Sequence, residues 1–273
     1  MLIIASNLTT RDRKIASMLK TATQAKDSSM VKGTMEFLGS LARECVAAGA
    51  NVIDINVQQH HDTPAIVEMA VNAVQGATNC QLCLSCHSLE ALEASLNACR
   101  RPPIVNYVSL DTQRLERILP LAARHQAEVV LLTADPMPPE TIEDTLKSAA
   151  VLVGAANEAG VPNSRIFIDP GVLHVTYSVG QRHSQTLIEL IPALAEAFDP
   201  PVRTTCWVDN VSAGAGARVR PFVNSGFFAF LAGLGLSSAF VDVLEGQMAR
   251  TIRLMRIFSN ELIYSDGEIS KRT

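Results

Sequence analysis

The sequence predicts an α/β protein of the (β/α)8 TIM-barrel class, and three observations support this prediction. Short β-rich runs recur about every thirty residues, each followed by a longer Ala/Leu-rich segment with helical periodicity. Eight such pairs fit within the 273 residues, a length typical of a closed barrel. The first strand runs into SNLTT rather than G-x-G-x-x-G, which disfavours the open doubly wound sheet, the main alternative.

The elements can be placed in chain order. Strands are predicted at 2–6, 51–57, 81–86, 104–109, 128–134, 165–169, 203–209 and 238–243, and helices near 30–48, 64–77, 88–99, 112–124, 140–160, 183–198, 220–234 and 245–263. The polar segment 7–29 is predicted to be an extended loop and a helix over one barrel mouth. Ser88 should cap the third helix, and Pro139-Glu140 should open the helix that Gly160 ends. Because no repeat or linker interrupts the chain, residues 1–273 are expected to form a single barrel domain.

The composition narrows the functional class. The chain is 48% hydrophobic and 18% charged, which allows a large core, and its net charge of -4 gives no cationic field for nucleic acid. No apolar run is long enough to span a membrane, and the apolar start is too short for a secretion signal. We therefore expect a cytoplasmic protein with neither a nucleic acid nor a membrane as partner.

The segment NCQLCLSCHS at 79–88 raises the question of a metal or iron–sulfur site. Because side chains alternate along a strand, Cys83 and Cys86 should point to opposite faces, while Cys80 and Cys86 lie roughly 20 Å apart on one face. We therefore predict buried thiols and no bound metal. The alternative is a zinc site that joins Cys86 and His87 to Cys206 at the barrel mouth. The pair His60-His61 is expected to lie in a solvated loop.

Polar residues follow most of the predicted strands. Active sites of such barrels lie at the carboxyl ends of the strands. No lysine occurs between Lys147 and Lys271, which excludes a Schiff-base lysine from the last three strand ends. Amides and carboxylates together are suited to a flat nitrogen heterocycle such as a guanine or a pterin. The residues at these ends are Asp54, Asn56, Ser85, Asn106, Asp135, Asp169, Asn210 and Asp242.

Six motifs, in order, give the chain a resemblance to a known family. They are MLIIAS, AGANVIDINV, LCLSCHS, IVNYVS, RIFIDPGV and DNVSAGAGARVRPFVN. With this order and spacing the chain resembles the methyltetrahydrofolate:corrinoid/iron-sulfur protein methyltransferases. These belong to the pterin-binding TIM-barrel family, which also includes dihydropteroate synthase. The resemblance covers essentially the whole chain, so residues 1–273 would be one pterin-binding barrel.

The resemblance implies a cytoplasmic homodimer that binds the small-molecule substrate methyltetrahydrofolate or tetrahydrofolate in the barrel mouth. Its N5-methyl group would move to or from the cobalt of cobalamin carried by a separate corrinoid (iron-sulfur) protein, in a direction that the resemblance leaves open. Asp169 and Asn106 would hold the pterin ring, and Asn210 would be the catalytic amide near N5. The other expected pterin contacts are Ser85, Asn56, Asp54, Ser212, Asn224 and Arg220. For Asp54 and Asn56 the alternative is a structural role on the barrel rim.

Three positions depart from the family pattern. Ser85 stands where the family has aspartate, Ser6 where it has glutamate, and Ala213 where it has glutamine. Loss of a charge-assisted hydrogen bond would weaken pterin binding by roughly 1.5–3 kcal/mol. Water or neighbours such as Cys86 and His87 would then fill in, or the ligand or activity would differ. The alternative functions are a non-catalytic or altered-specificity pterin- or corrinoid-protein-binding barrel and, less favoured, dihydropteroate synthase, whose late lysine and arginine pair is absent.

Overall fold

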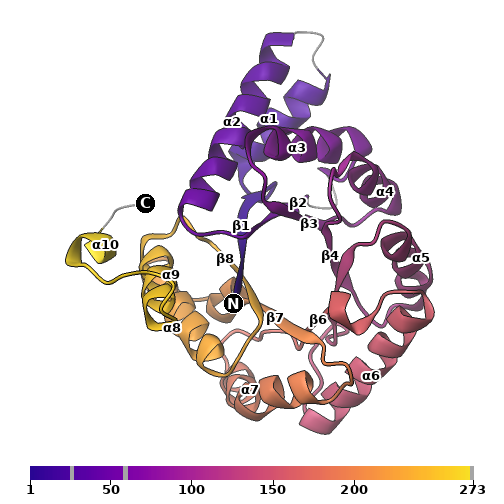
Figure 1. Cartoon of the computed structure of the whole chain (residues 1–273), viewed down its shortest axis with the longest axis vertical. Helices are drawn as coiled ribbons and strands as arrows, with labels where there is room; N and C mark the ends of the chain where they lie inside the picture. The colour runs from indigo at the N-terminus through magenta and orange to yellow at the C-terminus, as the bar shows by residue number, and fades with distance from the viewer. Residues whose placement is uncertain (25–27, 58–60, 271–273) are drawn as a thin grey trace.

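A closed barrel of eight parallel strands, in the order β1 to β8, forms the centre of the computed structural model, which describes residues 1–24, 28–57 and 61–270 (Figure 1). The predicted barrel is therefore confirmed. The strands are β1 Leu2–Thr9, β2 Val52–Asn56, β3 Gln81–Ser85, β4 Ile104–Val108, β5 Glu128–Leu132, β6 Ile166–Asp169, β7 Arg203–Trp207 and β8 Ser238–Val241.

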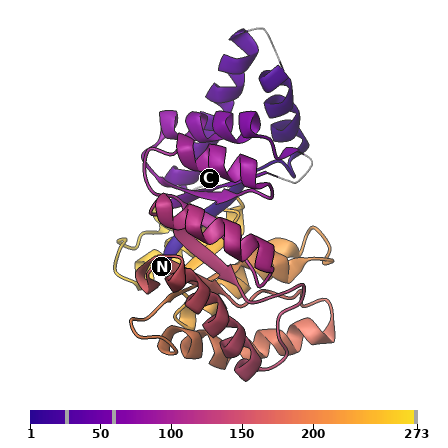
Figure 2. The ribbon, with the colours of Figure 1, turned by 90° about the vertical axis from the view of Figure 1, so that its right-hand side faces the viewer.

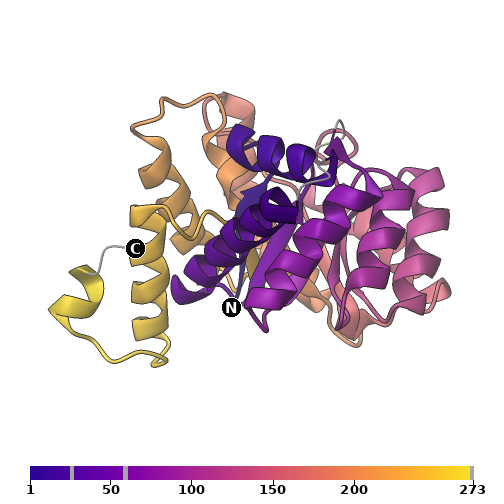
Figure 3. The same cartoon turned by 90° about the horizontal axis from the view of Figure 1, so that it is seen from above.

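Helices surround the barrel as an outer ring (Figure 1). The α1–α2 hairpin projects beyond this ring (Figure 2), and the short α10 lies away from the barrel (Figure 3). No helix in the described part of the chain is both long and apolar enough to cross a bilayer. The helices are α1 Arg13–Gln24, α2 Ser28–Ala47, α3 Pro64–Ala77, α4 Leu89–Ala98, α5 Thr112–Arg124, α6 Ile142–Glu158, α7 Ser178–Glu196, α8 Arg220–Gly233, α9 Gly246–Phe258 and α10 Asp266–Ser270.

Two hydrophobic clusters make up the core. The larger lies between the strands and the helices, and the smaller fills the barrel interior. Because strand residues alternate between the two faces, positions two or four residues beyond an interior residue also point inward. Polar side chains therefore gather inside the carboxyl end of the barrel, above an apolar layer. That layer consists of Ile4, Val52, Cys83, Ile104, Val130, Phe167 and Phe240.

Several element boundaries differ from the predictions. β1 continues to Thr9, which pairs with Asn56 of β2, so residues 7–9 are strand rather than loop. α6 begins at Ile142 after the cap Thr141, not at Pro139-Glu140. α7 begins at Ser178 rather than at 183.

The helix predicted to run to 263 is shorter in the structure. α9 ends at Phe258, and Asn260 just beyond it has a positive φ of 58°. Asparagine tolerates this left-handed conformation, which terminates helices. The capping role predicted for Ser88 is confirmed, since its hydroxyl accepts a hydrogen bond from the Ala91 amide.

Candidate active site

Two adjoining cavities occupy the end of the barrel where the strands finish. The narrower has a volume of about 250 Å³ and the wider a volume of about 660 Å³. Arg11, Trp207 and Asn210 line both cavities. The boundary between the two cavities is therefore formed by the start of the β1–α1 connection and the end of β7.

The narrow cavity collects the residues expected to hold the ring. Asp169, Asn106 and Asn210 all line it, together with Asn56 and Ser85. Asn106 and Asp169 are each 8% exposed. Asn210 is exposed towards the mouth. Side chains from β2, β3, β4 and β6 and from the segment after β7 thus converge on one hollow.

A chain of hydrogen bonds joins β4, β3 and β2 beneath this cavity. Asn106 Nδ2 donates to Ser85 Oγ over 2.8 Å, and Ser85 Oγ donates to Asp54 Oδ1 over 2.6 Å. Asn56 Nδ2 donates to the other oxygen of Asp54 over 3.4 Å. Because Ser85 engages the amide nitrogen of Asn106, the side-chain oxygen of Asn106 is the atom that can accept a hydrogen bond from a ligand.

Asp54 supports the site from below. It is fully buried and lines neither cavity, a position that favours the structural role over a pterin contact. Burial raises the pKa of Asp54 to about 6, against the lowering effect of hydrogen bonds from Ser85, Cys83 and Asn56. A carboxylate from β2 therefore lies next to Ser85, where the family pattern has its own aspartate.

Asp169 is the carboxylate that faces the narrow cavity. Its Oδ1 accepts a hydrogen bond from the Gly171 amide over 2.8 Å. Burial raises the pKa of Asp169 to about 7, opposed by that single hydrogen bond. Gly171 has a φ of 81°, and a Cβ there would lie 2.8 Å from Pro138 Cγ, so this turn requires glycine. The turn aims one oxygen of Asp169 at the backbone and leaves the other for a ligand.

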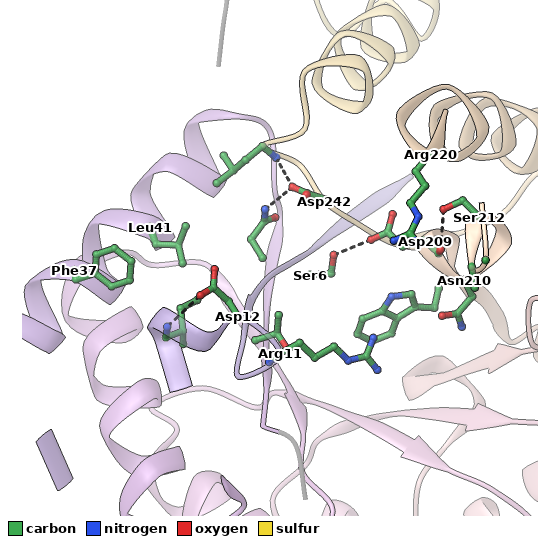
Figure 4. Close-up of a pocket in the computed structure, with 17 residues that line it drawn as sticks. Ser6, Arg11, Asp12, Phe37, Leu41, Asp209, Asn210, Ser212, Arg220 and Asp242 are labelled. Atoms are coloured by element: carbon green, nitrogen blue, oxygen red, sulfur yellow. Dashed lines mark hydrogen bonds between the residues drawn. The ribbon is translucent and has the colours of Figure 1, made fainter. Parts of the chain in front are cut away.

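Asp209 lines the wide cavity together with Asp12 and Asp242 (Figure 4). Its Oδ2 accepts a hydrogen bond from Ser6 Oγ over 3.3 Å, and its Oδ1 accepts one from Asn224 Nδ2 over 2.9 Å. Burial raises the pKa of Asp209 to about 6, and the nearby charge of Asp242 adds to this rise. Asp209 thus lies beside Ser6, the other position where the family pattern has a carboxylate.

Three of the expected pterin contacts belong to the surroundings of Asp209 instead. Ser212 Oγ donates to the main-chain oxygen of Asp209 over 3.3 Å, and Asn224 lines neither cavity. Arg220 lines the wide cavity, where its Nε donates to the Ala215 carbonyl over 2.9 Å. Ser212 and Arg220 thus line the wide cavity, Asn224 holds Asp209, and none of the three lines the narrow cavity.

The sequence interpretation missed Arg11, Trp207 and Asp209. Asp209 directly precedes Asn210 in W-V-D-N at a strand end, which was an available signal. Trp207 stacks on Phe240 with 4.8 Å between ring centroids, so it forms the top of the apolar interior. Arg11 follows the first strand, and only the contact between distant segments reveals its position at both cavities.

The cysteines and histidines do not form a metal-binding group in the described residues, where no cluster of three or more His, Cys, Asp or Glu has suitable geometry. Cys83 packs in the inner cluster and Cys86 in the outer one, as the strand alternation predicts, and Cys86 also lines the narrow cavity. Cys206 also packs in the outer cluster, and burial raises the pKa of all three thiols. His60 lies outside the described residues, and His61 is half-buried.

The barrel and its mouth define a class of protein. The family model for pterin binding enzymes matches residues 24–241, and the chain belongs to this family, as the resemblance predicted. It is 27% identical over 243 residues to the methylcorrinoid:tetrahydrofolate methyltransferase of Eubacterium limosum, in an alignment that covers 86% of this chain and 84% of that protein. Dihydropteroate synthase from Thermus thermophilus matches with a TM-score of 0.64 over 96% of this chain and 94% of that chain. At 18% identity this last likeness supports the fold alone.

Proposed function

We propose that this protein transfers a methyl group from a methylated corrinoid, carried by a partner protein, to N5 of tetrahydrofolate. The observation that supports it best is the convergence of Asp169, Asn106 and Asn210 on one narrow cavity in a pterin-binding barrel. The name of the Eubacterium limosum relative supports the direction of transfer.

The narrow cavity suits the bicyclic ring of the folate. Its volume of about 250 Å³ has room for a pterin but not for a whole folate with its tail. The Asp169 carboxylate would accept hydrogen bonds from a ring N–H and the exocyclic amine together. The side-chain oxygen of Asn106 would accept a further one, since its amide nitrogen is held by Ser85.

The wide cavity suits the remaining parts of the reactants. Its volume of about 660 Å³ leaves space for the folate tail and for access by the methylated corrinoid. Arg11 and Arg220 line this cavity, and guanidinium groups pair well with the carboxylates of a glutamate tail. Asn210 lies at the boundary, where N5 of a ring held by Asp169 would meet the methyl donor.

The proposed chemistry fits this set of side chains. The N5 lone pair attacks the methyl carbon directly, so the reaction needs no protein nucleophile. The protein holds both reactants in line and stabilises the charge that develops at N5. A polar amide such as Asn210 can stabilise that charge through its dipole, and it is too weak a nucleophile to take the methyl group itself.

The test mixes purified protein with tetrahydrofolate and methylcob(III)alamin without oxygen. Loss of the methylcobalamin spectrum with formation of methyltetrahydrofolate is expected, at a rate that Asn210→Ala lowers by about 10²-fold. The matched control is Asn157→Ala, an amide on α6 remote from both cavities.

Calorimetry with tetrahydrofolate separates the alternatives. Heat of binding without methyl transfer would contradict the enzyme assignment and indicate a pterin-binding module. An absence of binding would contradict the folate assignment itself.

A further inference from the structure

We propose that Asp209 is a catalytic base that accepts the N5 proton of tetrahydrofolate as the methyl group arrives. This inference rests on the proposed function and assigns the reaction a proton acceptor that neither the fold nor the three ring-binding side chains supply. It is carried by the position of Asp209, by its hydrogen bonds and by the charges around it.

Asp209 lies one residue before the boundary between the two cavities. It lines the wide cavity and immediately precedes Asn210, which lines both. Figure 4 shows the Asp209 carboxylate turned towards Ser6 across the cavity, on the same side as Asn210 and Ser212. A pterin whose far edge is held by Asp169 would present its N5 side to this boundary. The carboxylate is thus placed next to the reacting half of the ring.

Two neutral donors fix the Asp209 carboxylate without neutralising it. Ser6 Oγ and Asn224 Nδ2 each donate one hydrogen bond, at 3.3 and 2.9 Å. An ionised oxygen can accept more than one hydrogen bond, so the carboxylate keeps capacity for a proton. A salt bridge would hold the group ionised at a low pKa, and none of the described ion pairs involves Asp209.

The other acids near the wide cavity are engaged elsewhere. Asp242 Oδ1 accepts hydrogen bonds from Asn7 Nδ2 and from the amides of Leu244 and Glu245. Asp12 Oδ1 accepts from the first amides of α1. Both carboxylates hold backbone turns, whereas the hydrogen bonds described for the Asp209 carboxylate come from side chains.

The charged groups around Asp209 set its titration. Asp242 and Glu245 raise its pKa, and Arg11 lowers it, while burial has the largest effect and brings the pKa to about 6. Asp12 and Arg220 also line the wide cavity. Near neutral pH the group is therefore mostly ionised and able to accept a proton, and a base works best when its pKa lies close to the operating pH.

The step balances in atoms and electrons. The N5 lone pair forms the N5–CH3 bond, the carbon–cobalt bond breaks, and both of its electrons leave with cobalt, which is reduced from Co(III) to Co(I). The N5–H bond then yields its proton to a carboxylate oxygen of Asp209. In the reverse direction the protonated Asp209 would return this proton to N5.

The test compares the pH dependence of kcat in the wild-type protein, Asp209→Asn and Ser6→Ala, with tetrahydrofolate and methylcob(III)alamin as probes. Wild-type kcat should rise with pH through about 6. Asp209→Asn keeps the shape of the side chain but not the base, so kcat should fall by about 10²-fold, with that rise lost and tetrahydrofolate affinity nearly unchanged. Asp266→Asn, on the remote α10, is the control.

Ser6→Ala tests the same role without relying on the folding of Asp209→Asn. The Ser6 hydroxyl lowers the pKa of Asp209, so its removal should move the rise in kcat to higher pH. An unchanged pH profile in either variant, or a loss of folate affinity that alone explains the lower rate, would overturn the role of Asp209. Failure of the wild-type protein to transfer methyl groups would instead remove the proposed function and this inference with it.

Discussion

In the protein without a ligand, the Asp169 carboxylate is buried but has few hydrogen-bond donors around it among the described residues. It faces the narrow cavity, and the hydrogen bond described for its carboxylate comes from the Gly171 amide. Burial therefore raises its pKa to about 7, because the ionised form lacks solvation. A ligand that supplies two N–H donors would restore that stabilisation. The carboxylate is thus prepared for a ligand with adjacent donors, as the pterin edge provides.

At the residue scale we predict that Asp169→Asn weakens tetrahydrofolate binding by roughly 10–100-fold, because one charge-assisted interaction is lost. Wild-type affinity should rise as pH increases through about 7, with release of a proton on binding, and the variant should lack this dependence. Calorimetry in buffers of different ionisation enthalpy measures both. Asp135→Asn, at a strand end that lines neither cavity, is the matched control, and an equal loss there would contradict a direct contact.

At the scale of elements, side chains link three neighbouring strands above the apolar interior. Asn106 of β4, Ser85 of β3 and Asp54 of β2 form one connected chain in which Ser85 both donates and accepts. The backbone ladder holds the strands together, but this chain fixes the orientation of the Asn106 amide. We therefore propose that Ser85 positions the Asn106 amide.

We predict that Ser85→Ala destabilises the protein by about 1–3 kcal/mol, since it leaves a buried carboxylate oxygen and a buried amide without their partner. Tetrahydrofolate affinity should fall as well, because the Asn106 amide is no longer held. Denaturant unfolding and calorimetry measure the two effects. Ser238→Ala removes a buried serine at the start of β8, the end of the barrel away from the cavities, and should leave folate affinity unchanged. A normal affinity in Ser85→Ala would exclude the positioning role.

The sequence was sufficient to predict the barrel, because eight alternating strand and helix pairs leave few architectures. It was also sufficient to predict that Asp169, Asn106 and Asn210 face one cavity, because parallel strands of a barrel end on one side. For Asp209, the sequence offered the motif W-V-D-N near a strand end but no indication of its contacts. The significance of that residue depends on Ser6, which lies 203 positions earlier and contacts it only after the barrel closes. The sequence also did not show how deeply each side chain is buried. Asp54 and Asn56 point to the same face of β2, but only Asn56 lines the narrow cavity.

For the whole molecule, burial concentrates three acids of raised pKa near one end of the barrel. The pKa values of Asp54 and Asp209 are about 6 and that of Asp169 about 7, each raised from 3.8. Between these values and 3.8, the folded state binds more protons than the unfolded chain. The contribution of these acids to stability is therefore complete below about pH 4 and is lost as pH rises towards about 7.

We predict that Asp169→Asn, which removes one buried charge, gains stability relative to the wild-type protein as pH rises from about 4 to about 7. The difference should reach on the order of 1–4 kcal/mol, since each pKa unit corresponds to about 1.4 kcal/mol. Urea unfolding of both proteins without folate, at about pH 5 and about pH 8, measures it. The comparison cancels all other titrating groups. A difference that does not change with pH would show that Asp169 titrates normally.

The contact between Ser6 and Asp209 also bears on how related barrels are compared. A search that scores each alignment column separately would register a lost acid at position 6 and assign no value to the gain at position 209. In three dimensions, however, Asp209, in the short helical turn after β7, brings a carboxylate within hydrogen-bonding distance of Ser6. Members of this family with seemingly incomplete motifs are therefore better judged by the charges inside the barrel opening than by the identity of any one column.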